Sequence, residues 1–407
     1  MGACCVLEVA PKGASTTARP TTPKSARRKS EGLQADRPGA TLHDAAWEGN
    51  VNLVRKLLVK DSPDLPDEEG STPLHLAAEE GHLKVVRCLI EDGKASCVDA
   101  ADGEGSTPLL LAAKEGRTEV VEYLLTRASL QSPNKPNADG ATPLLCAVQK
   151  GRASVVKLLL GHDAHTVDMA NNDGETPLNL AAGKGDTEMV QMLLHQGNSK
   201  SVDTPDRLGW TPVLMAAYGG HAGALRLLLK SKAQAAASHS ANGETPLFCA
   251  AKRGHVEVVK LLLTSSEVQM VDACDSDGNT PLMMAAQFGF VEALRLLVSM
   301  KASIDLRNKA SETALLLAAQ EGFLEAISFL LEEGSQAVNM AAADGRTPLI
   351  AAERFGNDEV CRFLLHRRAD PHTKIEGCAG METSGSGVDS ARQFSDHQVR
   401  LVIEQSS

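Results

Sequence analysis

Apolar residues recur along most of the chain in pairs of short runs, and each pair follows the last after about 34 residues. The first run is short and often contains two adjacent alanines, as at Ala77 and Ala78. The second run is longer, as in residues 257–263, and its apolar residues are spaced to share one face of a helix. A turn rich in Gly, Asp and Asn precedes the next pair. The pattern predicts two short helices and a turn in every copy.

Three columns of residues define the register of this repeat. A threonine, followed by proline in all but one case, opens the copies at Thr72, Thr107, Thr142, Thr176, Thr211, Thr245, Thr280, Thr313 and Thr347, and Ala40-Thr41 opens an earlier copy. A glycine stands near the middle at Gly49, Gly81, Gly116, Gly151, Gly185, Gly220, Gly254, Gly289, Gly322 and Gly356. A leucine follows at Leu57, Leu89, Leu124, Leu159, Leu193, Leu228, Leu262, Leu297, Leu330 and Leu364. Thr caps a helix start, Pro suits the first helical position, and Gly accepts the left-handed conformation that ends a helix.

The copy at residues 70–82 reads GSTPLHLAAEEGH. It resembles the ankyrin repeat, whose hallmark is Thr-Pro-Leu-His-x-Ala in a period near 33 residues. The resemblance covers residues 39–374, as ten copies that start near residues 39, 71, 106, 141, 175, 210, 244, 279, 312 and 346. It implies an all-α fold, an ankyrin-repeat solenoid of stacked helix-turn-helix units with β-turn or hairpin tips. Such a stack presents a long concave surface, on which ankyrin proteins bind their partners.

Some copies depart from the ankyrin hallmark. Its histidine is present only at His43 and His75, and the later copies carry Leu110, Leu145, Asn179, Leu214, Phe248, Met283, Leu316 and Ile350. We expect these copies to lose a polar clamp. In the ninth copy Ala314 replaces the proline and Ser311 replaces the turn glycine, so this copy is predicted to be the weakest.

The two ends of the chain lack the repeat. Residues 1–38 hold seven basic residues against three acidic ones, and we predict a disordered basic arm. Residues 375–407 are predicted to be a mostly disordered tail. The arm precedes the repeats richest in acid, so residues 19–30 are hypothesised to fold back onto them, and phosphate on Ser30 would weaken that docking. A simple extension, a nuclear-import patch and a transit segment are the alternative interpretations of the arm.

The first residues resemble an N-terminus that is myristoylated at Gly2 and palmitoylated at Cys4 and Cys5, although Val6 stands where the motif has Ser or Thr. One lipid chain holds a protein weakly, so the cysteines and the basic arm would supply the second signal. An unmodified Gly2 in a mass measurement of the full-length protein would exclude this hypothesis.

Composition and motifs exclude several classes of protein. The charged fraction of 23% and apolar fraction of 43% are those of a folded, soluble protein, and the net charge of -11 argues against a nucleic-acid binder. The nine cysteines show no metal or disulfide spacing, which favours free thiols in a reducing, cytoplasmic compartment. No signal peptide, membrane span, phosphate loop, GxSxG or HExxH motif is found, so we predict no enzyme activity, cofactor or metal.

Binding residues are expected where the copies differ, because ankyrin proteins bind through the turn tips and the two residues before the helix-ending glycine. Rigid aromatic residues there are typical interface anchors. In the first five copies these positions hold ten acidic residues against three lysines, whereas the last five are close to neutral. The predicted partner-binding residues are Trp210, Tyr218, Trp47, Glu68, Glu69, Glu79, Glu80, Phe288, Lys252 and Arg253.

The sequence therefore predicts a cytoplasmic scaffold or adaptor, a monomeric repeat array that binds one or more proteins. Trp210 and Tyr218 are the favoured anchors, and the glutamates would attract a basic segment of the partner. Alternatives are an adaptor recruited to the membrane by acylation, an adaptor that also enters the nucleus, an enzyme without recognisable motifs, and a purely structural spacer. The identity of the partners and the pathway is not specified by the sequence.

Deletion of residues 1–38 tests the proposed role of the arm. We expect the deletion to tighten the binding of a basic peptide, because the arm would no longer compete for the acidic repeats. Fluorescence anisotropy with a labelled basic peptide measures the effect, and an unchanged affinity would refute the idea.

Overall fold

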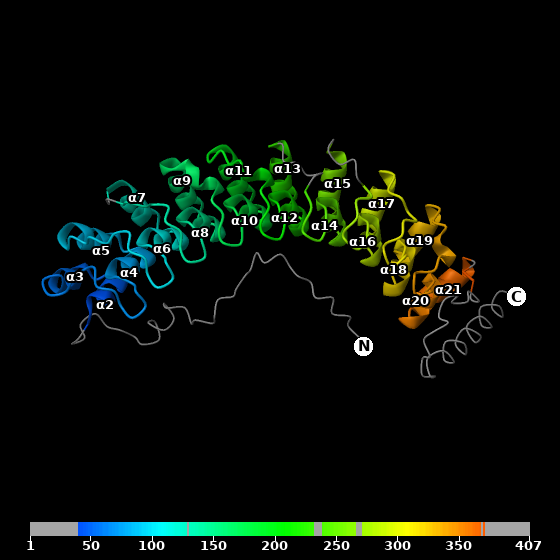
Figure 1. The fold of residues 1–407 in the computed structure, drawn as a ribbon, viewed down its shortest axis with the longest axis horizontal. Coiled ribbons are helices and arrows are strands. Elements are labelled where there is room, and N and C mark those ends of the chain that lie inside the picture. Colours follow the sequence, from blue (N-terminus) through cyan, green and yellow to red (C-terminus); the bar gives the residue numbers. More distant parts are fainter. Residues whose placement is uncertain (1–39, 128–129, 232–237, 266–270, 368, 371–407) are drawn as a thin grey trace. The chain divides into compact units, whose positions relative to one another are not determined.

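The computed structural model describes residues 40–127, 130–231, 238–265, 271–367 and 369–370. The chain divides into two compact units, Met1–Met215 with Lys230–Ala233 and Ala216–Leu229 with Gln234–Ser407. Each unit is a stack of helix pairs, and the part of the chain that is described contains no β-strand (Figure 1). The predicted all-α ankyrin-type fold is therefore confirmed.

The first helices of the pairs in the first unit are α2 (Leu42–Trp47), α4 (Pro73–Glu80), α6 (Pro108–Glu115), α8 (Pro143–Gln149) and α10 (Pro177–Lys184). Their second helices are α3 (Val51–Leu57), α5 (Leu83–Arg87) with the π-helical turn η1 (Cys88–Asp92), α7 (Thr118–Arg127), α9 (Ala153–His162) and α11 (Thr187–His195). The short 3₁₀ turns η2 (Ala164–Asp168) and η3 (Ser201–Asp203) follow α9 and α11.

Helix α12 (Pro212–Gly219) contains the boundary between the units. The first helices that follow are α14 (Pro246–Lys252), α16 (Pro281–Gln287), α18 (Ala314–Glu321) and α20 (Pro348–Arg354). The second helices are α13 (Ala222–Lys230), α15 (Val256–Thr264), α17 (Val291–Ser299), α19 (Leu324–Glu332) and α21 (Asp358–His366), with the 3₁₀ turn η4 (Ala337–Asn339) after α19.

Helix α6 shows how the repeated residues produce the fold. The Thr107 hydroxyl accepts a hydrogen bond from the Leu110 amide, and Pro108 occupies the first turn, where its missing N–H costs nothing. Gly116 ends the helix in the left-handed conformation, with φ of 80°. Ala112 and Ala113 are fully buried. Because they are small, α6 packs closely against both α4 and α8.

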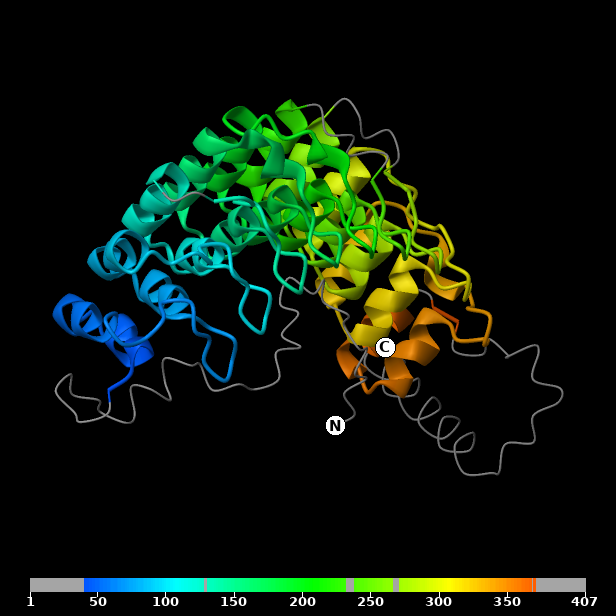
Figure 2. The ribbon, with the colours of Figure 1, turned by 60° about the vertical axis from the view of Figure 1, so that its left-hand side comes forward.

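The tips before the first helices are joined by backbone hydrogen bonds. Within a tip, Asp67 accepts from the amides of Glu69 (3.0 Å) and Ser71 (2.8 Å) through one carboxylate oxygen. Between tips, the Gly103 amide donates to the Glu69 carbonyl at 2.9 Å. The loops before α4, α6 and α8 therefore lie side by side, as Figure 2 shows. Each tip is positioned by its neighbour as well as by its own turn.

The hallmark histidine clamps one repeat to the next. Nδ1 of His75 accepts from the Thr72 amide (3.1 Å) and hydroxyl (2.9 Å). Nε2 lies 3.0 Å from the Ala100 carbonyl and 3.1 Å from the Ser106 carbonyl. A neutral imidazole with its proton on Nε2 fits all of these contacts. The ring is buried, and this burial lowers the pKa of His75 below the usual histidine value.

Asn179 makes the clamp contacts of the hallmark histidine, which this copy was predicted to lose. Its side-chain oxygen accepts from the Thr176 hydroxyl, and its Nδ2 donates to the Trp210 carbonyl at 2.8 Å. The amide has an acceptor and a donor in the places of the two imidazole nitrogens. The prediction that this copy loses the clamp was therefore wrong.

The ninth copy contains one strained residue, Ser311, in the turn before its first helix. Ser311 has φ of 60°, in the left-handed region where Gly278 and Gly345 stand in the neighbouring tips. A side chain in this conformation costs about 1 kcal/mol, because its Cβ crowds the backbone. The Ser311 carbonyl accepts a hydrogen bond from Arg307 Nε at 3.1 Å.

The His75 clamp predicts a pH dependence of stability. Because burial disfavours the imidazolium, the unfolded chain binds this proton first, near pH 6.5. The stability that His75 contributes is thus present above pH 6.5 and falls as the pH drops towards the lower pKa of the folded state. For one group this slope cannot exceed about 1.4 kcal/mol per pH unit. His75→Asn, which copies Asn179, should keep the clamp and reduce the dependence.

Urea unfolding at pH 7.5 and 5.5 measures this difference. His366→Asn, at an exposed position in the last turn of α21, is the control and should behave as the natural chain does. Equal losses of stability in His75→Asn and in the natural chain would contradict the prediction.

Ser311→Gly should stabilise the ninth copy by about 1 kcal/mol, because glycine adopts the left-handed conformation without a Cβ clash. The control is Ser328→Gly within α19, which should destabilise by a similar amount, since glycine is a poor helix former. Thermal unfolding followed by circular dichroism compares the two. If Ser311→Gly lowers the melting temperature, the strain does not limit the stability of this copy.

Candidate functional site

Tyr218 and Arg253, two of the predicted binding residues, form one stacked pair in the second unit. Arg253 caps the end of α14 and is exposed, and Tyr218 is half-buried. Nη1 of Arg253 donates a hydrogen bond to the Tyr218 hydroxyl at 2.8 Å, and its guanidinium carbon lies 4.2 Å from the centre of the Tyr218 ring. The Tyr218 carbonyl lies 3.0 Å from Nε2 of His255. The pair is therefore held in place before any partner arrives.

Lys252 is engaged within its own repeat. Its ammonium group lies 3.3 Å from the Glu244 carboxylate, whose side chain is 14% exposed. The same group lies 5.8 Å from the centre of the buried Phe248 ring. Lys252 therefore neutralises a nearly buried acid, and Arg253 beside it carries the more exposed positive charge.

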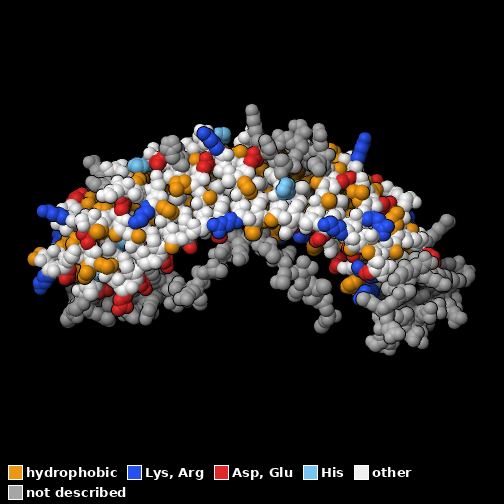
Figure 3. Space-filling model, viewed as in Figure 1, with side chains coloured by type: hydrophobic (Ala, Val, Ile, Leu, Met, Phe, Trp, Pro, Cys, Tyr) orange, Lys and Arg blue, Asp and Glu red, His pale blue; other side chains and the backbone are white. Residues whose placement is uncertain are grey.

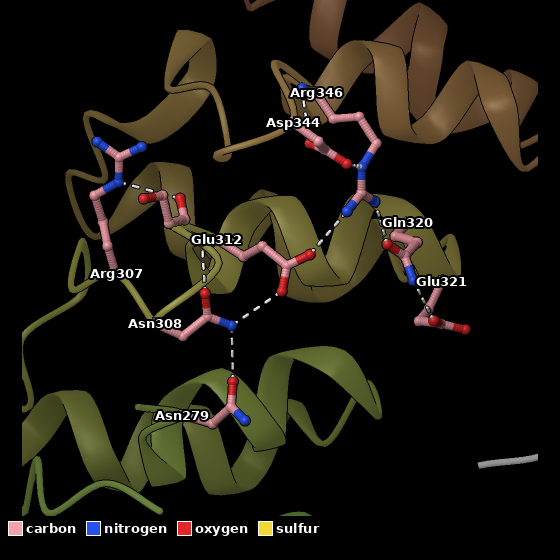
Figure 4. Close-up of polar contacts among 9 residues, drawn as sticks. Asn279, Arg307, Asn308, Glu312, Gln320, Glu321, Asp344 and Arg346 are labelled. Carbon is pink, nitrogen blue, oxygen red and sulfur yellow. Dashed lines mark hydrogen bonds and ion pairs between the residues drawn. The ribbon is translucent and has the colours of Figure 1, made fainter. Parts of the chain in front are cut away.

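A polar network joins the last three tips (Figure 4). Nδ2 of Asn308 donates to Asn279 Oδ1 and to Glu312 Oε2, both at 2.9 Å. Arg346 donates to Glu312 Oε1 at 2.9 Å and to Gln320 Oε1 at 2.8 Å. Glu312 and Arg346 stand at variable positions of the tips, yet their side chains are only 15% and 18% exposed. The network braces the ninth copy beside its strained turn.

Arg346 also forms an ion pair with Asp344. Partial burial opposes ionisation of Asp344, but the hydrogen bonds and positive charge of Arg346 prevail and hold the pKa of this carboxyl below its usual value. This part of the tip surface is thus already paired and offers little net charge to a partner.

Trp210 is buried, although it was predicted to anchor a partner. Its side chain is only 6% exposed, so the indole belongs to the core of the repeat and is not presented to a partner. The backbone of Trp210 also stabilises the turn before α12, because its amide donates to Asp206 Oδ1 at 2.8 Å. Trp210 lies in the first unit and Tyr218 in the second, so the two predicted anchors belong to different units. The prediction of Trp210 as an exposed anchor was wrong.

The acidic surface of the first repeats is smaller than the sequence suggested. Glu68 and Glu69 are exposed at the first tip, and acidic side chains are visible over these repeats in Figure 3. Arg117, which follows a helix-ending glycine, lies 3.7 Å from the Glu80 carboxylate and donates to the Glu79 carbonyl at 2.8 Å. Arg152 pairs with Glu115 in the same way, at 3.8 Å. Among the predicted acidic binding residues, Glu68 and Glu69 at the tip are therefore the most exposed.

Trp47 and Phe288 are both accessible. Trp47 is half-buried, and its carbonyl lies 2.9 Å from Nε2 of His82. Phe288 is 41% exposed, and its ring stacks on that of Phe290 with centres 6.4 Å apart. Phe290 follows a helix-ending glycine, as Arg117 does. This position lies outside those predicted to bind a partner, although its residue varies from copy to copy.

The proposed modification residues Gly2, Cys4, Cys5 and Ser30 lie outside the described residues. Across the described residues, no helix is long and apolar enough to cross a membrane. Within the same part of the chain, no group of three or more His, Cys, Asp or Glu side chains is placed to hold a metal ion.

Stacked pairs of short helices with joined tips define a class of repeat proteins. A family model described as "Ankyrin repeats (3 copies)" matches the chain at residues 42–137, 128–204, 165–238, 196–272, 216–308 and 282–375. These matches span most of the chain, and the protein belongs to the ankyrin-repeat family.

Curated relatives match shorter stretches. Apoptosis-stimulating of p53 protein 2 of Homo sapiens is 36% identical over 85 residues, which are 20% of this chain and 7% of that protein. Protein phosphatase 1 regulatory subunit 27 of Homo sapiens is 46% identical over 56 residues, 13% of this chain and 36% of that protein. Protein fem-1 homolog A of Danio rerio is 45% identical over 58 residues, 13% of this chain and 9% of that protein. The match thus spans well under half of each relative, and family and relatives together support a protein-interaction role.

Proposed function

We propose that this chain is an adaptor that binds partner proteins through the surface formed by its tips and by the C-terminal ends of its first helices. The stacked pair of Tyr218 and Arg253 carries the proposal. Tyr and Arg, together with Trp, are the residue types that contribute most often to binding energy at protein interfaces. Their stacking fixes the side chains in advance, which reduces the entropy that a partner must overcome on binding.

The exposed charges indicate how partners approach. Glu68 and Glu69 begin a row of tip acids, and the equivalent positions of the next three tips hold Glu104, Asp139 and Asp173, all exposed. A basic segment of a partner would be attracted to these carboxylates, and salt would slow its association. The relative named a regulatory subunit of a phosphatase supports a role in binding other proteins.

The thiols support a cytoplasmic location for the adaptor. Cys88, Cys97, Cys146, Cys249, Cys274 and Cys361, the cysteines among the described residues, are all free. Cys97 and Cys274 are exposed, and exposed thiols persist in a reducing compartment.

Affinity purification with mass spectrometry tests the adaptor function. Full-length protein is compared with Tyr218→Ala/Arg253→Ala and with the control Arg226→Ala, an exposed arginine on α13 that pairs with Glu257. We expect partners that the natural chain and the control retain and the double variant loses, since a hot spot contributes at least about 2 kcal/mol, or roughly 30-fold in affinity.

Circular dichroism of each variant first establishes that its helical content is unchanged. Partners that persist with the double variant would place the binding surface elsewhere. If no specific partner is recovered with the natural chain, the spacer alternative is favoured instead.

A further inference from the structure

Phenylalanines gather around the helix-ending glycine of the eighth repeat. The rings of Phe288 and Phe290, on either side of Gly289, stack at 6.4 Å with an angle of 26° between their planes. Phe323 of the next repeat lies directly on this glycine, because a side chain added to Gly289 would overlap the Phe323 ring. Three rings from two repeats thus form one cluster, here called the phenylalanine patch.

The patch is open to solvent. Phe288 is 41% exposed and Phe323 is 38% exposed, and Phe290 is half-buried. Phe355 occupies the position of Phe288 two repeats later and is 53% exposed. Four of the eight phenylalanines of the chain therefore stand beside helix-ending glycines, although large apolar rings are normally buried. Clustered exposed rings of this kind mark interaction surfaces.

The fold itself does not require phenylalanine after the glycine. In several other repeats this residue is polar and reaches a backbone carbonyl near the end of the preceding first helix. His82 lies 2.9 Å from the Trp47 carbonyl, and Asn357 donates to the Gln320 carbonyl at 2.8 Å. Phe290 and Phe323 have no side-chain donor and cannot make this contact. Their rings expose apolar surface where a hydrogen bond would serve the stack, which favours a role in binding.

The rim of the patch is mostly acidic, although the exposed Arg253 adjoins Gly254, which the Phe290 ring covers. Glu292 and Glu325 stand two residues after Phe290 and Phe323, in the first turns of α17 and α19, and both are exposed. Glu321, also exposed, precedes Phe323 by two residues. Arg295 pairs with Glu292 at 4.0 Å, and its guanidinium carbon lies 4.9 Å from the centre of the Phe329 ring. The negative charge of the rim therefore rests mainly on Glu321 and Glu325. Apolar rings within an acidic rim are complementary to apolar side chains flanked by positive charge.

We propose that the phenylalanine patch is a docking surface for a short segment of a partner protein that carries bulky apolar side chains flanked by Lys or Arg. The proposal rests on the proposed protein-binding function and adds a second site with its own partner chemistry. The rings supply the apolar contact, and Glu321 and Glu325 select for positive charge.

Selection from a phage-displayed random peptide library on the full-length protein tests this proposal. The enriched peptides are synthesised with a fluorophore and their affinities are measured by anisotropy. We expect bulky apolar residues beside Lys or Arg, and affinities at least about tenfold weaker with Phe288→Ser/Phe323→Ser. Met300→Ser is the matched control, since Met300 is 46% exposed at the other end of α17 and should leave binding unchanged.

A second variant leaves the rings in place, so that a folding defect caused by their loss cannot explain its result. Glu321→Lys/Glu325→Lys changes only exposed rim charges, and it should weaken the same peptides and reduce the effect of salt on their binding. Peptides that bind both variants as tightly as the natural chain, or a selection without enrichment, would overturn the proposal. If Phe394→Ser in the tail tightens peptide binding about tenfold, the occupant is the chain's own tail, and the proposal of a separate partner fails.

Failure of the patch can be distinguished from failure of the adaptor function. Partners that depend on Tyr218 and Arg253 but not on Phe288 and Phe323 would leave the adaptor function intact and remove only this second site.

Discussion

Close packing of neighbouring first helices is the constraint on which the rest of each unit depends. Ala77, Ala78, Ala112 and Ala113 are completely buried, and their small side chains allow α4 and α6 to approach. Only at this spacing can the Gly103 amide reach the Glu69 carbonyl in the preceding tip. A single helix pair could not bury its apolar face, so every repeat takes its stability from its neighbours.

The contacts between repeats are specified by geometry more than by residue type. His75 and Asn179 clamp their threonines to a later turn with different chemical groups. The residue after the helix-ending glycine reaches back with an imidazole at His82, a guanidinium at Arg117 and an amide at Asn357. The feature shared by these copies is a donor placed opposite a backbone carbonyl. This explains why the copies differ in sequence and still stack in the same way.

Positions that the stack does not use are free to acquire binding chemistry, which is why the fold alone does not specify the partner. The Tyr218 and Arg253 pair and the phenylalanine patch both stand beside glycines that end first helices. The two surfaces differ in character, since one presents a stacked guanidinium and the other presents apolar rings within an acidic rim. A chain with both could hold two partner segments of different chemistry within its second unit.

The sequence by itself determined the helices and their ends, because the signals are local. A threonine hydroxyl caps the helix that follows it, and a glycine ends a helix through its own backbone. Only the tertiary structure decided which side chains are exposed. The Trp210 indole is buried, Arg117 neutralises Glu80 from the next repeat, and Phe323 lies on Gly289 although 34 residues separate them. Such contacts depend on how one repeat is placed against another, and no local pattern of residues contains that placement.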